Sequence, residues 1–79
     1  MGLAKTEEQW QERARAFLKG QLKQAGMTYA DLIKRLKKYG FRETESSITM
    51  KLKRGTFSAT FFLACLAAIG RKSVALAEI

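Results

Sequence analysis

Residues 46–70, SSITMKLKRGTFSATFFLACLAAIG, place a polar and basic run directly before an almost wholly apolar one, with Gly55 between them. The apolar run is too short to span a bilayer, which takes about 20 apolar residues, so it predicts a buried helix of a folded domain. The polar run has only two apolar anchors, Ile48 and Leu52, one helical turn apart. We therefore expect a helix that is attached to the core along one face and offers its opposite face to solvent or to a partner.

The chain is long enough for one small domain, residues 1–79, with 47% hydrophobic residues. Its single cysteine, Cys65, lies inside the apolar run and is expected to be a small buried side chain. With no histidine and no second cysteine, the sequence excludes a metal site of the His/Cys type, and we expect no cofactor. The N-terminal stretch turns acidic at once, so no signal peptide and a cytoplasmic location are expected.

Basic residues are concentrated in the middle of the chain. Lys and Arg number 15 against 7 Asp and Glu, for a net charge of +8. Residues 13–54 hold twelve of the basic side chains and three of the acidic ones, whereas residues 55–79 hold only Arg71, Lys72 and Glu78. Such an excess attracts polyanions, and nucleic acid is the first candidate.

Apolar periodicity and capping residues predict a compact all-α domain of four helices. The expected ranges are 7–25, 28–38, 44–54 and 58–69. Thr6, Thr28, Thr44 and Ser58 begin these helices, and Gly26, Gly40, Gly55 and Gly70 follow them. The fourth helix is apolar nearly all round, and its predicted central core residues are Phe61, Phe62, Leu63, Leu66 and Ile69. The tail, residues 71–79, alternates weakly at Val74 and Leu76, which indicates a short edge strand or a frayed end.

At about 100° per residue, four side chains of the third helix fall on one stripe away from Ile48 and Leu52. The predicted base-facing residues are Ser46, Thr49, Met50 and Lys53. Ser and Thr can donate to or accept from base edges, and Met can contact a thymine methyl group. Six basic side chains around the stripe are predicted to contact phosphates: Arg35, Lys37, Lys38, Arg42, Lys51 and Arg54. An ordinary solvated face accounts for the same polarity, and this interpretation stays open.

Two acidic residues, Glu43 and Glu45, oppose phosphate binding near the start of this helix, although there they also suit the positive end of the helix dipole. Basic residues of the first helix, among them Lys19 and Lys23, are more simply a solvated face. Trp10 is either a core side chain or a contact residue for a protein partner.

The stretch MTYADLIKRL, a turn, and then residues 46–70 resemble the lambda repressor-like (Cro/C1-type) helix-turn-helix domain. The match rests on the opening from Thr28 to Leu32, on Arg54-Gly55 and on Ile69-Gly70. A closer resemblance is to a family of small bacterial domains of unknown function. It rests on TYADL at residues 28–32, Arg54-Gly55, Phe57, Ala59 and FFL at residues 61–63. The resemblance implies a helix-turn-helix and DNA binding, but no activity.

The sequence departs from the repressor pattern between the two helices of the motif. Ile33 falls where a small residue is expected, Lys37 falls where the turn glycine is expected, and Gly40 comes three residues later. The first helix of the motif or its turn is therefore expected to be about one helical turn longer.

The sequence predicts a DNA-binding helix-turn-helix protein, a bacterial transcriptional or accessory regulator whose partner is double-stranded DNA. The alternative is a helical protein-interaction or dimerisation module without DNA binding, and RNA binding is a third interpretation. A homodimer stays open, because one module makes few contacts and such proteins commonly read paired half-sites. No enzymatic activity and no small-molecule substrate are expected, since the residue sets that catalysis needs are absent from the sequence. No membrane association is expected, because the apolar run is too short to span a bilayer.

Overall fold

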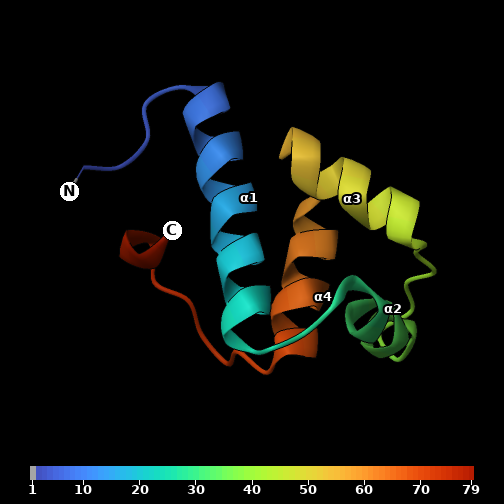
Figure 1. Cartoon of the computed structure of the whole chain (residues 1–79). Helices are drawn as coiled ribbons and strands as arrows, with labels where there is room; N and C mark the ends of the chain where they lie inside the picture. Colours follow the sequence, from blue (N-terminus) through green and yellow to red (C-terminus); the bar gives the residue numbers. More distant parts are fainter. Residues whose placement is uncertain (1) are drawn as a thin grey trace.

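Four helices make up the fold in the computed structural model, which describes residues 2–79 (Figure 1). The helices are α1 (Glu7–Gln24), α2 (Tyr29–Lys37), α3 (Glu45–Arg54) and α4 (Ala59–Ile69). A 3₁₀ turn, Leu76–Glu78, follows in the tail. The prediction of an all-α fold is confirmed, and the helices agree with the expected ranges to within one residue at each end.

Each helix begins at a hydroxyl side chain that accepts a hydrogen bond from a free backbone N–H three residues later. The four pairs are Thr6 with Gln9, Thr28 with Asp31, Thr44 with Ser47 and Ser58 with Phe61. At Thr28 and Thr44 the bond is reciprocated, because the Asp31 and Ser47 side chains accept from the cap residue's own N–H. At Thr6 it is not: Gln9 Oε1 accepts from the N–H of Lys5, at 2.8 Å. Local sequence signals therefore set all four helix starts.

Every helix contributes side chains to one core. The buried cluster is Leu18 and Leu22 of α1, Leu32 and Leu36 of α2, Ile48 and Leu52 of α3, and Phe61, Cys65 and Ala68 of α4. Helix α1 packs on α3 and α4, and α2 packs on the same two helices (Figure 1). The two aliphatic side chains that α1, α2 and α3 each bury lie one turn apart, as an amphipathic helix requires.

The chain turns sharply between α3 and α4, whose axes differ by 113°. The turn is held by Phe57, whose ring stacks on Phe62 with centroids 5.8 Å apart and lies 5.5 Å from the Phe61 ring. This contact is a hydrophobic staple at the start of α4. It directs the apolar helix inward immediately after the polar one.

Gly55 ends α3 in the left-handed conformation, with φ 70°. It is buried, and a Cβ at this position would lie 2.6 Å from the backbone oxygen of Gln11 and 3.0 Å from its carbonyl carbon. The end of α3 therefore lies against the backbone of α1 at a distance that only glycine permits.

Two predictions for the C-terminal third are wrong. The tail forms no edge strand: Leu76–Glu78 is a 3₁₀ turn, with the Glu78 carboxylate accepting from the N–H of Ala75. Leu63 is 63% exposed rather than central to the core. The tail returns toward α1, where Arg71 donates to Gln21 Oε1, and Leu63 is left beside an open hollow between α4 and the tail.

No single helix within residues 2–79 is both long and apolar enough to cross a membrane; only α3 and α4 taken together, with their 113° bend, would meet the criteria of length and composition.

Replacing Gly55 with Ala is expected to destabilise the fold by more than about 3 kcal/mol, because the left-handed conformation and the contact with Gln11 both resist a Cβ. Gly26→Ala is the matched control, since Gly26 has φ +64° but no atom within 4 Å of the place that an added methyl group would take. It should cost about 1 kcal/mol. Urea unfolding measures both; equal losses would contradict the close approach of α3 to α1.

The Cys65 thiol is expected to be unreactive in the folded protein. Burial, followed by the nearby Glu43 carboxylate, raises the pKa of Cys65 from 9.0 to about 12. The protonated thiol therefore stabilises the fold below pH 9, and this contribution is lost as the pH rises toward 12. At about pH 8 Ellman's reagent should label the native protein at least about 100-fold more slowly than the protein in urea. Equal labelling rates would show that Cys65 is accessible.

Candidate nucleic-acid interface

Helix α3 has one buried and one exposed face. Ile48 and Leu52 are fully buried. The four predicted base-facing residues, Ser46, Thr49, Met50 and Lys53, are all exposed. Because they recur at i, i+3, i+4 and i+7, they form a continuous stripe, here called the α3 stripe. The anchoring and the exposed stripe are as the sequence predicted.

Basic side chains come before, within and after the α3 stripe along the chain. Lys37 and Lys38 come at the end of α2, Arg42 in the connection to α3, and Arg54 at the end of α3. These four side chains and that of Lys53 are all exposed. None of the five takes part in an ion pair within residues 2–79. We call Lys37, Lys38, Arg42, Lys53 and Arg54 the α2–α3 basic set. Their charges are available to an anionic partner.

Glu43 is not free to repel phosphate, because its carboxylate is engaged inside the domain. Its side chain is 7% exposed, and it accepts from Lys51 Nζ and from Ser47 Oγ, at 2.6 Å each. Lys51 Nζ also lies 4.4 Å from the centroid of the Phe61 ring. Lys51 was predicted to contact phosphate; in this structure its charge balances Glu43 and fastens α3 to the connection that precedes it.

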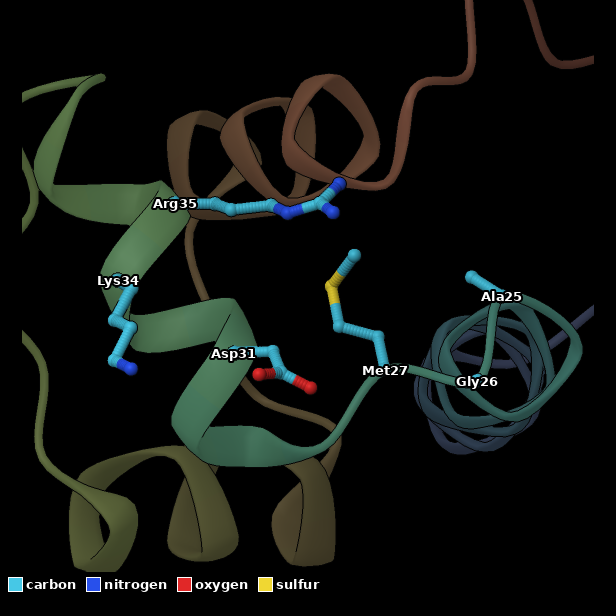
Figure 2. Close-up of a pocket in the computed structure, with 6 residues that line it drawn as sticks. All are labelled: Ala25, Gly26, Met27, Asp31, Lys34 and Arg35. Carbon is cyan, nitrogen blue, oxygen red and sulfur yellow. The ribbon is translucent and has the colours of Figure 1, made fainter.

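Arg35 was also predicted to contact phosphate, but its side chain extends toward α4. Its Nη1 donates to the carbonyl oxygen of Ala68 at 2.9 Å, which satisfies a carbonyl at the end of α4. Figure 2 shows the Arg35 side chain beside a hollow of about 170 Å³, with Met27 pointing into that hollow. The Arg35 guanidinium is thus part of the packing of α2 on α4.

Asp31 borders the same hollow at the start of α2 (Figure 2). Hydrogen bonds from the backbone and then the side chain of Thr28 hold the pKa of Asp31 below its usual value. The carboxylate therefore serves as the acceptor in the cap at the start of α2. Within residues 2–79 every buried side-chain nitrogen or oxygen has a hydrogen-bond partner, and no group of three His, Cys, Asp or Glu side chains could hold a metal ion.

The connection between α2 and α3 is longer than the 3–4-residue turn of an ordinary helix-turn-helix, since residues 38–44 separate the two helices. Helix α2 itself has nine residues, so the additional length relative to such a turn lies in the connection. Lys37, Gly40, Phe41, Arg42 and Glu43 line an open hollow of about 650 Å³ at this connection. This hollow was not predicted from the sequence. The one residue nearby that signals an unusual turn in the sequence is Gly40, which has φ 87° in the structure.

The remaining candidates lie on α1. On α1, Arg15 pairs with Glu12 and Arg13 donates to the carbonyl of Gly2, whereas Lys19 and Lys23 extend from the same helix without an ion pair among residues 2–79. Trp10 is 38% exposed and is outside the buried core cluster.

These features define a small all-α domain with one exposed, largely polar helix face and, within and next to it in the chain, basic side chains that form no ion pair within residues 2–79. The chain belongs to the family described as a domain of unknown function (DUF6471), whose model matches residues 10–74. The match extends over all four helices and the start of the tail. No curated protein and no solved structure matches the chain.

Removing the Glu43 carboxylate should destabilise the domain, because Lys51 and Ser47 would lose their shared partner. We expect Glu43→Ala to cost about 2–3 kcal/mol in the free energy of unfolding. Glu45→Ala removes the same charge from an exposed position in the first turn of α3 and should cost only about 0.3–1 kcal/mol. Urea denaturation of both variants measures the difference, and a Glu43→Ala loss no larger than that of Glu45→Ala would contradict the role given to the Lys51 pair.

Proposed function

We propose that this domain binds double-stranded DNA, with α2, the connection and α3 acting as a helix-turn-helix and α3 entering the major groove. On this proposal the protein is a bacterial transcriptional or accessory regulator that works in the cytoplasm. The resemblance to lambda repressor-like domains supports the proposal at residues 28–32, 54–55 and 69–70. Membership of a family without an assigned function neither adds to it nor opposes it.

The observation that carries the proposal is the exposed α3 stripe, with the exposed side chains of the α2–α3 basic set in the stripe itself and on the segments directly before and after it. A helix anchored along one face and polar along the other has the dimensions to fit a major groove, which is about 12 Å wide. The internal pairing of Glu43 with Lys51 removes one of the two acidic charges beside the stripe. Glu45 is the acidic residue that remains exposed there, at the helix start where the dipole favours it.

Phosphate contacts would supply most of the affinity. Four unpaired basic side chains that each neutralise one phosphate, Lys37, Lys38, Arg42 and Arg54, give a slope of about −3.6 for log K against log salt concentration. Binding to an arbitrary duplex should then be micromolar at about 50 mM salt and weaker by two to three orders of magnitude at about 200 mM. Arg35 could contact a phosphate only by giving up its hydrogen bond to Ala68, and Lys51 only by giving up its ion pair with Glu43. We therefore expect these two residues to contribute less to DNA affinity.

Sequence preference would come from the α3 stripe. Lys53 can donate to guanine O6 and N7, the hydroxyl groups of Ser46 and Thr49 can bond to several base edges, and Met50 can contact a thymine methyl group. Because the stripe has no Arg, Asn or Gln for bidentate pairing, we expect a modest preference among sequences. Because the connection between α2 and α3 is long, α3 need not enter the groove at the angle that a repressor uses. The proposal therefore concerns which surface contacts DNA.

The double variant Lys53→Ala/Arg54→Ala should weaken DNA binding by about 10- to 100-fold and make the salt slope shallower by up to about 2. Fluorescence anisotropy of a labelled duplex at the two salt concentrations measures this. Lys19→Ala/Lys23→Ala is the matched control, because it removes the same charge from α1, away from the α3 stripe. It should change affinity by less than about threefold.

Two results would contradict the proposal. The first is a wild-type protein that binds no duplex even at the lower salt concentration, despite its charge of +8. The second is an equal loss of binding in the α1 and α3 double variants, which would mean that net charge and not the α3 surface attracts DNA.

A second candidate function, protein interaction, is favoured by a separate observation. The exposed apolar side chains Trp10 and Leu63 lie on α1 and α4, outside the α3 stripe.

A further inference from the structure

The two most exposed large hydrophobic side chains of the described chain lie beside the same hollow. Leu63 of α4 is 63% exposed and Leu76 of the tail is 61% exposed. Both line a hollow of about 340 Å³ between α4 and the tail, together with Leu66, Val74 and Ile79. We call this surface the α4–tail face. Leaving two leucines in water is unfavourable by about 25 cal/mol for each Å² of apolar surface.

The α4–tail face is a built feature, because hydrogen bonds hold the tail in place. The Arg71 guanidinium donates to Gln21 Oε1 at 2.8 Å, to the carbonyl of Ser73 at 3.1 Å and to Glu78 Oε1 at 2.7 Å. The other Glu78 oxygen accepts from the N–H of Ala75 at 2.8 Å. These bonds keep Leu76 at the rim of the hollow opposite α4.

Charge indicates what can cover this face. The chain carries a net charge of +8, so two copies repel each other unless they meet where charge is lowest. On the α4–tail face Arg71 is paired with Glu78, and Lys72 is the other charged residue that lines the hollow. An acidic protein would be drawn instead to the α2–α3 basic set. A second copy of the chain is therefore the occupant that the charge distribution favours.

The shape of the face suits the same occupant. A two-fold interface uses one surface twice, so that surface must carry both a projection and a recess that receives it. The α4–tail face has both, in the exposed leucines and the hollow between them. We infer that the protein forms a homodimer through the α4–tail face, with Leu63 or Leu76 of each copy entering the hollow of the other.

This dimer would leave the proposed DNA surface open. The tail turn and α3 lie on opposite sides of α1 in Figure 1. The inference does not rest on DNA binding, and it is tested without DNA. Because the face is small, the dimer should be weak, with a Kd between about 10 µM and about 1 mM.

Sedimentation equilibrium over about 1 µM to about 1 mM protein is the test. The average mass of the wild type should rise from 8.9 kDa toward twice that value. Higher salt should strengthen the dimer, because it screens the repulsion between two positively charged copies. Salt acts in the opposite direction on DNA binding, so the two proposals can fail separately.

Leu63→Lys should keep the protein monomeric throughout, since it adds a charge to the two-fold contact. Leu3→Lys is the matched control, with the same change at a leucine that is 55% exposed and does not line the hollow. It should dimerise like the wild type, and circular dichroism checks that both variants fold. A wild type that stays at 8.9 kDa at the highest concentration would overturn the inference. So would a Leu63→Lys variant that dimerises normally, or a Leu3→Lys variant that loses the dimer equally.

Discussion

The backbone of Gly55 lies against the backbone of Gln11, and the position of α3 depends on that approach. Helix α3 buries only Ile48 and Leu52, which is little apolar area for a ten-residue helix. Its hold on the domain is completed by Gly55 against α1 and by Lys51 with Ser47 on Glu43. None of these attachments involves a residue of the α3 stripe, so the side chains of the stripe are free to contact a partner.

The acidic residues lie at helix starts or in ion pairs, which leaves basic side chains such as those of the α2–α3 basic set unpaired within residues 2–79. Four of the seven carboxylates lie in the first turn of a helix, where the dipole stabilises them: Glu7, Glu8, Asp31 and Glu45. The other three form ion pairs, Glu12 with Arg15, Glu43 with Lys51 and Glu78 with Arg71. Helix starts and local pairing thus engage every acidic side chain in the sequence. The α2–α3 basic set is left without compensation, whereas the α4–tail face is nearly neutral.

Features that depend on a few neighbouring residues could be predicted from the sequence. The caps at Thr28, Thr44 and Ser58, the left-handed ends at Gly55 and Gly70, and the exposed stripe of α3 all follow from spacing within one helix. Features that depend on distant residues could not. Arg35 bonds to a carbonyl 33 residues away, and nothing in its own surroundings signals this. Leu63 has apolar neighbours in the sequence, as a core residue does, yet its exposure depends on where the tail runs. Sequence spacing brought Ser46, Thr49, Met50 and Lys53 together correctly, but the engagement of Lys51 by Glu43 required the fold.

A titration of ¹⁵N-labelled protein with a short duplex tests most directly whether the α3 stripe and the α2–α3 basic set form the DNA surface. Chemical shifts of the backbone amides report each residue separately. We predict changes concentrated at residues 37–42 and 45–54, with the amides of Lys19, Lys23 and the tail unaffected. Shifts spread along the outer side of α1, or confined to α4 and the tail, would contradict this assignment of the surface.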